Sequence, residues 1–104
     1  MTDFYYKTTK SFDVTITVNG VVQDISGDTV TIILKKKKQD SDAEAVLLKE
    51  SFENTVSGVA KFIFTPTETN LPIGTYYYEI KWVNGTNVYI REYDTVKVLE
   101  RVFD

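Results

Sequence analysis

The sequence predicts an all-β domain, an antiparallel β-sandwich of about seven short strands, with a small barrel as the alternative. Apolar and polar residues alternate in several short stretches, turn signals recur about every ten residues, and no stretch has the period of a long helix. A chain of 104 residues has the size of one domain and can form a two-layer core. We therefore expect residues 1–104 to form a single domain.

The first strand is expected after a polar beginning. Residues 1–11 predict a loose arm or a weak edge strand. Residues 12–18 alternate strictly, with apolar side chains at the even positions, so they predict a strand with one buried face. Asn19-Gly20 then predicts a turn, and residues 21–27 predict a short extended connection.

Residues 28–37 predict the next strand, and its end carries four consecutive lysines, Lys35 to Lys38. Successive side chains of a strand point to opposite faces, so these lysines cannot form one basic stripe. An acidic segment follows, and the formal net charge of the chain is −3, which weighs against binding to nucleic acid. We interpret the lysines as a strand leaving the sheet into a solvated loop, or as charges that guard an edge.

The acidic segment Asp40, Asp42 and Glu44 has the spacing with which a calcium-binding EF-hand loop begins. The sixth position of such a loop would be Ala45 instead of glycine, and the twelfth would be Ser51 instead of glutamate. The sharp turn and the bidentate ligand are both missing. We therefore predict no metal site here and interpret the segment as a hairpin loop.

The middle of the chain predicts two further strands. Residues 46–52 favour a strand, with a helical turn as the competing interpretation, and residues 53–58 predict a loop. Residues 59–64 (VAKFIF) alternate and predict a strand. Its inward face is expected to consist of Ala60, Phe62 and Phe64.

Thr65-Pro66-Thr67-Glu68 has the pattern of a helix capping box, with proline at the first helical position. It predicts one short helical turn near residues 66–71. Pro72 disfavours helical geometry at Leu71, so the turn cannot continue. We expect Leu71 to anchor it in the core.

Residues 74–83 predict the longest strand, and Asn84-Gly85 marks a hairpin turn. A three-residue loop, residues 84–86, would pair apolar residues inside and opposite charges outside, whereas a two-residue loop would place Ile90 opposite Glu79. We therefore predict the three-residue loop, then a bend near Tyr93-Asp94 and a closing strand over residues 95–99. The expected inward pairs are Trp82 with Val88 and Ile80 with Ile90, and the expected outward pairs are Glu79 with Arg91, Lys81 with Tyr89 and Tyr77 with Tyr93.

The outward residues of this hairpin form the candidate interaction patch. Aromatic side chains stack on sugars, so a carbohydrate-binding module is one interpretation. Tyrosine and arginine are also enriched in protein interfaces, and tyrosine favours half-exposed strand positions in any protein. The patch consists of Tyr77, Lys81, Tyr89, Arg91 and Tyr93.

The sequence contains no histidine and no cysteine. The usual catalytic triads, thiol nucleophiles and transition-metal sites therefore cannot be built. The carboxylates show no local pattern of a paired site, so we expect no enzyme, no catalytic residue and no cofactor. No signal peptide is visible, and no apolar stretch approaches the roughly 20 residues of a membrane helix, so we expect no membrane partner.

Residues 71–76 (LPIGTY) resemble the approach to strand F of immunoglobulin-like domains. In that resemblance Tyr76 is the residue of the tyrosine corner, and Tyr78 takes the place of the second cysteine of antibody domains. The cysteines themselves are missing, so the resemblance implies immunoglobulin-like architecture alone.

A wider resemblance covers residues 12–100. Residues 24–32 (DISGDTVTI) are similar to the "D-L-T-G, then alternating strand" segment in the N-terminal domain of phage baseplate upper proteins. Residues 62–80 are similar to that family's "strand, T-x-x-x-T, L-P-x-G-x-Y, strand" core, and residues 95–99 to its closing strand. The order and the spacing of these segments match the family.

The wider resemblance implies an immunoglobulin-like β-sandwich that is a non-enzymatic structural or adaptor component of a phage or prophage tail or baseplate. Its location would be the virion, after synthesis in the bacterial cytoplasm. Its partners would be other virion or tail proteins, and a homo-oligomer stays open. Larger members of the family continue into receptor-proximal regions, so we expect a small standalone virion protein or an excised domain.

Overall fold

The computed structural model of the protein describes residues 3–100, and within the last strand it describes the backbone but not the side chains of residues 91–93. The described residues are mostly β, with about 55% of them in strands and about 3% in helix. Its sheets are antiparallel apart from one parallel pair at an edge. No helix within residues 3–100 has the length and apolar character needed to cross a membrane.

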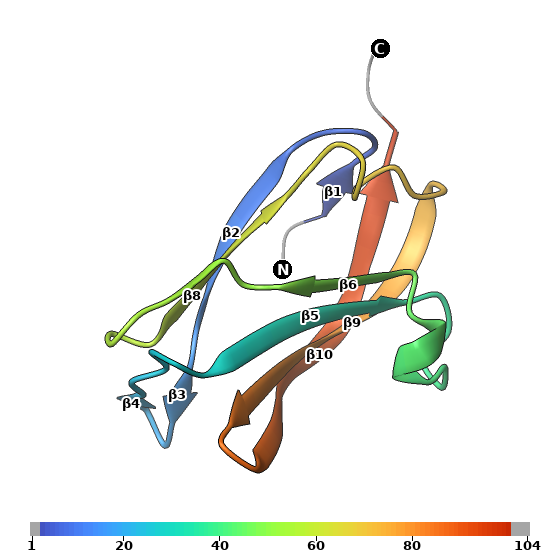
Figure 1. Cartoon of the computed structure of the whole chain (residues 1–104). Helices are drawn as coiled ribbons and strands as arrows, with labels where there is room; N and C mark the ends of the chain where they lie inside the picture. The colour runs from blue at the N-terminus through green and yellow to red at the C-terminus, as the bar shows by residue number, and fades with distance from the viewer. Residues whose placement is uncertain (1–2, 101–104) are drawn as a thin grey trace.

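The larger sheet has five strands and contains the longest hairpin of the molecule (Figure 1). One edge strand of this sheet pairs in parallel with its neighbour, and all other neighbouring strands are antiparallel. In spatial order, the strands are β1 (Phe4–Tyr5), β10 (Asn87–Leu99), β9 (Gly74–Asn84), β5 (Thr29–Lys35) and β6 (Leu47–Glu50).

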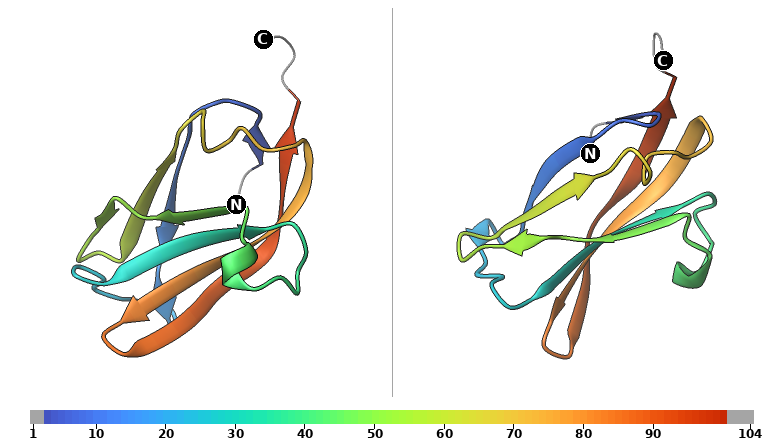
Figure 2. Two further views of the ribbon diagram at one scale, coloured as in Figure 1. Left: turned by 45° about the vertical axis from the view of Figure 1, so that its right-hand side comes forward. Right: turned by 45° about the horizontal axis from the view of Figure 1, so that its top comes forward.

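The smaller elements lie across the core from this sheet (Figures 1 and 2). A three-stranded sheet has the order β2 (Lys10–Thr15), β8 (Val59–Phe64) and β7 (Glu53–Asn54). A separate hairpin joins β3 (Thr17–Val18) to β4 (Val21–Val22). The strand predicted over residues 46–52 is confirmed as β6. The loop predicted over residues 53–58 contains the short strand β7.

One hydrophobic core takes side chains from both larger sheets. The alternating patterns predict the inward faces of β8 and β9 correctly, whereas the end of β5 is buried on both faces, at Ile33 and Lys35 as well as at Leu34. Phe12 packs beside this core and stacks on Phe62 and Phe64, with ring centroids 5.5 and 6.0 Å apart. The buried inward residues of β5, β8 and β9 are Val30, Ile32, Leu34, Ala60, Phe62, Phe64, Tyr76, Tyr78, Ile80 and Trp82.

Within the segment 1–11, predicted as a loose arm or a weak edge strand, Phe4–Tyr5 form the edge strand β1, and residues 10–11 begin β2. The ring of Phe4 is fully buried and lies 5.0 Å from that of Phe64. Strand β1 pairs with the end of β10, and the Tyr6 N–H donates to the Leu99 carbonyl at 2.9 Å. A strand of two residues shows no period in the sequence, so only its position beside β10 reveals it.

Residues 12–18, predicted as one strand, are divided at Ile16 between two sheets. The Ile16 N–H donates to the Gly58 carbonyl at 2.8 Å, and its own carbonyl accepts from the Gln23 N–H at 3.0 Å. The chain thus changes partners while its inward alternation continues. The predicted turn at Asn19-Gly20 is confirmed, with positive φ angles of 52° and 79° that suit a tight hairpin.

The capping box at Thr65 forms, and the single turn predicted near residues 66–71 is present as a hydrogen-bonded turn over residues 66–69, in which the Thr69 N–H donates to the Thr65 carbonyl at 3.0 Å. The Thr65 N–H donates to Glu68 Oε1 at 2.9 Å, and the Glu68 N–H donates to Thr65 Oγ1 at 3.2 Å. The turn ends at Thr69, which is fully buried and exchanges hydrogen bonds of 2.6 and 2.9 Å with the Thr8 backbone. Thr69 is therefore the buried anchor, while the predicted anchor Leu71 is only partly buried.

The predicted register of the last hairpin is wrong. Asn84 pairs with Asn87 and Trp82 with Tyr89, so Gly85 and Thr86 form a two-residue loop, with Gly85 at a φ of 60°. A β-bulge between Ile90 and Glu92 then shifts the pairing, and β10 continues without a break through residues 93–94, where a bend was predicted. The bulge interrupts the period of two, and a register inferred from alternation cannot include it.

Candidate functional site

The predicted interaction patch is only partly assembled on one face. Tyr77 and Lys81 lie on the outer face of β9 with Glu79, as predicted. Tyr89 pairs with Trp82, so it lies on the opposite face, where the two ring centroids are 4.9 Å apart. The side chains of Arg91 and Tyr93 lie outside the described residues.

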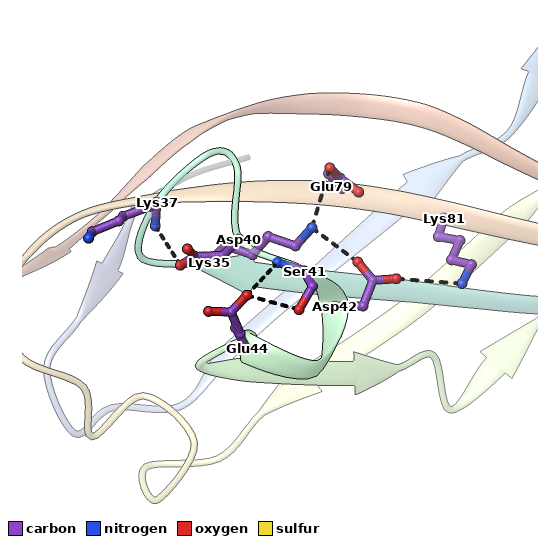
Figure 3. Close-up of polar contacts among 8 residues, drawn as sticks. All are labelled: Lys35, Lys37, Asp40, Ser41, Asp42, Glu44, Glu79 and Lys81. Carbon is purple, nitrogen blue, oxygen red and sulfur yellow. Dashed lines mark hydrogen bonds and ion pairs between the residues drawn. The ribbon is translucent and has the colours of Figure 1, made fainter.

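A cluster of charged side chains occupies the centre of this outer face (Figure 3). Lys35, predicted to enter a solvated loop, is only 7% exposed, and its strand β5 is an interior strand. Its Nζ lies 3.0 Å from Asp42 Oδ1 and 3.8 Å from Glu79 Oε1. The other carboxylate oxygen of Asp42 lies 3.8 Å from Lys81 Nζ. Asp42 therefore bridges one lysine from β5 and one from β9.

The loop between β5 and β6 holds Asp42 in this position. It contains the short 3-10 helix η1 (Asp42–Glu44). The Ser41 N–H and hydroxyl donate to Glu44 Oε1 at 3.1 and 3.0 Å, and the Glu44 N–H donates to the Ser41 carbonyl at 2.9 Å. These contacts, led by the Ser41 N–H, lower the pKa of Glu44. The hairpin loop predicted here is confirmed, but as an ordered turn over the sheet.

The cluster has the electrostatics of a structural site. The hydrogen bond with Asp42 raises the pKa of Lys35, partial burial opposes this effect, and Glu79 adds to it. Because the pKa of Lys35 is raised, this lysine stays a cation at neutral pH. A lysine that acts as a base or nucleophile needs a lowered pKa. Both oxygens of Asp42 face lysines, and no group of three potential metal-ligating side chains gathers within the described part of the chain.

A pocket of about 160 Å³ opens beside this cluster, between the end of β5 and the β9–β10 ladder. Its charges are mixed, two lysines and two acids, with Tyr77 as an aromatic wall. Its volume is below the ~300 Å³ at which pockets for larger organic ligands begin, so it admits one small polar group or ring. The lining residues are Lys35, Lys38, Tyr77, Tyr78, Glu79, Asp94 and Thr95.

Two residues of this cluster, Lys35 and Asp42, did not stand out as a pair in the sequence. The lysine run predicted a strand that leaves the sheet into a solvated loop, and the acidic segment after it predicted a hairpin loop. The pattern Ser41-Asp42-Ala43-Glu44 is a capping box, and this signal could have indicated an ordered turn that holds Asp42. The approach of that turn to Lys81 is a tertiary contact without a local signal.

Comparisons of this chain with models of protein families, with curated proteins and with solved structures found no match.

Proposed function

We propose that this chain is an immunoglobulin-like β-sandwich that acts as a non-enzymatic structural or adaptor component of a phage or prophage tail or baseplate. It acts through protein–protein contacts within the particle. The resemblance of residues 12–100 to the N-terminal domain of phage baseplate upper proteins is the basis for the particle. The order of the strands supports the architecture.

The strand order is the observation that carries the architectural part of the proposal. Strands β10, β9, β5 and β6 lie side by side, as strands G, F, C and C′ do in variable-type immunoglobulin domains. Strands β2, β8 and β7 correspond in the same way to strands B, E and D. Each role is taken in chain order, so connectivity and spatial order both support an immunoglobulin-like domain.

Tyr76 supports the same architecture. Its hydroxyl donates to the carbonyl of Pro72, four residues upstream, just after the chain enters β9. A tyrosine near the start of strand F that bonds to the backbone a few residues upstream is the tyrosine corner of this architecture. The burial of Tyr76 raises its pKa, so the phenol remains a donor at neutral pH.

The surface supports a role in protein contacts. Large apolar side chains are exposed near the edges of the larger sheet, among them Leu48 on β6 and Val88 and Ile90 on β10, each at least half exposed. Exposed apolar groups of this kind suit protein interfaces. Protein–protein contact is therefore the explanation of this surface that the proposal adopts.

The direct test is the composition of particles from a strain that encodes the chain. Particles are induced, purified through a density gradient and analysed by quantitative mass spectrometry. We expect the chain in a fixed ratio to the tail proteins in intact particles. Its absence from particles, while it is abundant in the lysate, would contradict the proposal.

The pocket beside Tyr77 favours a carbohydrate-binding module as the second candidate. An aromatic wall with nearby carboxylates and lysines offers one face for stacking and several groups for hydroxyl contacts. On a glycan array, Tyr77→Ala should lose binding, while Ile63→Ala, on the other sheet, should retain it. Equal binding by both variants, or none by the wild type, would exclude this candidate.

A further inference from the structure

The outer edge of β10 is largely without a neighbouring strand. The edge strand β1 pairs only with Val98 and Leu99, at the end of β10. No strand within residues 3–100 pairs with the rest of this edge. An unpaired edge offers a row of backbone donors and acceptors to any other strand.

The half of this edge near the end of β10 is protected by side chains. The Lys97 N–H donates to Asp3 Oδ1 at 3.0 Å. The Thr95 N–H donates to the carboxylate of Asp94 at 2.8 Å. Both outward N–H groups therefore already have acceptors, and both acceptors are negatively charged. Charged side chains of this kind are a common means of closing an edge against further pairing.

The half near the hairpin turn has the opposite character. In a two-residue hairpin the flanking pair, here Asn84 and Asn87, exchanges hydrogen bonds, so the next residue and every second one after it direct their backbone outward. Those residues are Val88 and Ile90, which are 57% and 50% exposed. Residues 87–90 contain no charge and no proline. This segment therefore lacks the charges and the proline that protect many edges, and the β-bulge of β10 follows only after Ile90.

We propose that two copies of this chain pair through residues 87–90, antiparallel, about a twofold axis at Tyr89. Val88 of each copy exchanges backbone hydrogen bonds with Ile90 of the other. The five-stranded sheet of one copy and that of the other thereby become one continuous sheet. This inference rests on the proposed function, because it specifies how one building block of a particle contacts another.

The segment is self-complementary, and this feature favours a second copy as the occupant. Val88 and Ile90 are equally spaced from Tyr89, so a twofold axis there matches donor to acceptor and apolar side chain to apolar side chain. The chain carries a net charge of −3, but no charge within the segment faces its copy. The turn of the hairpin lies clear of the other strands in all three views, so a second copy can approach it (Figures 1 and 2).

Disulfide trapping tests the register. The sequence has no cysteine, so Tyr89→Cys introduces the sole thiol. Across the axis the two residues at position 89 form a non-hydrogen-bonded pair about 4.5 Å apart, within the range that a disulfide spans. Under mild oxidation, Tyr89→Cys should form a covalent dimer much faster than Leu48→Cys, a control on the exposed edge strand β6. Equal rates would overturn the proposed register.

Analytical ultracentrifugation tests the pairing without altering the contact of Tyr89 with Trp82. The wild type should self-associate as its concentration rises, Ile90→Lys should remain a monomer, and Ile63→Lys should associate like the wild type. Ile63 is the matched control because it is 42% exposed on β8, in the other sheet. A wild type that stays monomeric at about 1 mM, or an Ile90→Lys variant that still associates, would overturn the inference.

The two proposals can fail separately. A chain that is present in particles but does not dimerise through this edge keeps its proposed function and loses this inference. Binding of residues 87–90 to a different particle protein, with no dimer, has the same consequence. A dimer of a chain that is absent from particles would contradict the proposed function alone.

Discussion

Asp28 is half-buried and ties several strands together through both its carboxylate and its backbone carbonyl. Its Oδ2 accepts from the indole N–H of Trp82 at 3.0 Å, and both of its oxygens accept from the Asn84 side chain at 3.0 and 3.2 Å. The Asp28 carbonyl accepts from the Asn54 side chain at 2.6 Å. The start of β5 is thereby joined to the end of β9 and to β7.

Asp28→Ala should destabilise the protein by about 1–3 kcal/mol, because the buried indole N–H of Trp82 loses its acceptor. The measurement is urea unfolding followed by tryptophan fluorescence, which reports this site directly since the sequence has one tryptophan. Asp28→Asn keeps an acceptor oxygen and should lose less stability. Equal losses for the two variants would show that the hydrogen bond to Trp82 contributes little.

A second contact at the residue scale connects the two larger sheets and depends on pH. Lys49 Nζ, on β6, lies 3.0 Å from each carboxylate oxygen of Glu68, in the turn after β8. Burial raises the pKa of Glu68, but the Thr65 N–H and Lys49 lower it, and the net direction is below the ordinary 4.5. The folded state thus binds this proton less readily than the unfolded state, so the contribution is present above about pH 4.5 and is lost as the pH falls further.

Glu68→Gln should cost about 1 kcal/mol at pH 7, because the ion pair with Lys49 is lost and the hydrogen bond with Thr65 is weakened. The difference in unfolding free energy from the wild type should shrink below about pH 4.5, where Glu68 of the wild type becomes protonated. Urea unfolding at a series of pH values measures both. Glu50→Gln, an exposed change on β6, is the control and should follow the wild-type curve. A gap that stays constant down to pH 3 would contradict the role given to Glu68.

At the scale of elements, Gly58 allows two separate pieces of the chain to meet. It ends the turn between β7 and β8 at a φ of 82°. A Cβ added there would lie 2.5 Å from Val22 Cγ1 and 2.8 Å from the Gln23 carbonyl oxygen. The turn before β8 therefore approaches the β3–β4 hairpin more closely than any residue other than glycine would permit at position 58.

Gly58→Ala should be more destabilising than Gly20→Ala, by at least about 1 kcal/mol. Gly20 has a similar φ of 79° but no atom within 4 Å of an added Cβ, so it reports the backbone strain alone. Thermal unfolding of the two variants provides the comparison. Equal melting temperatures would show that the β3–β4 hairpin moves aside at no cost.

At the scale of the whole molecule, the core joins strands that are far apart in the chain. Phe4, from the first strand, packs on Phe64 and pairs with Val98 through the backbone. Side chains of both larger sheets contribute to one cluster. A domain with one core of this kind is expected to unfold in one cooperative step.

Phe4→Ala should lower the stability by about 3–5 kcal/mol, as expected for a fully buried phenylalanine. Tyr5→Ala is the matched control, since Tyr5 is 54% exposed, and should change the stability by about 0.5 kcal/mol or less. Denaturant unfolding should give coincident curves by far-UV circular dichroism and tryptophan fluorescence. A small effect of Phe4→Ala would mean that β1 detaches without affecting the core.

Local patterns were sufficient to predict the mostly β character of the chain and most of its strands. The alternation over residues 59–64 and 74–83 gave the correct inward faces because the two faces of a strand follow from its own backbone geometry. The hydrogen bonds of the capping box at Thr65 also formed as predicted, since both partners lie within four residues. Tyr77 and Lys81 lie on one face for the same local reason.

Tertiary structure alone decided the rest of the candidate surface. The two-residue loop at Gly85 and Thr86 set the pairing of β9 with β10 ahead of the bulge, and this register placed Tyr89 against Trp82 instead of beside Lys81. Lys35 was expected to be solvated, but it is buried and pairs with Asp42. By itself, the sequence determined which residues alternate and where the chain turns. Only the tertiary structure decided which strands pair and in which register. Pairing depends on the free energy of contacts between residues that are far apart in the sequence, and a local pattern contains no information about those contacts.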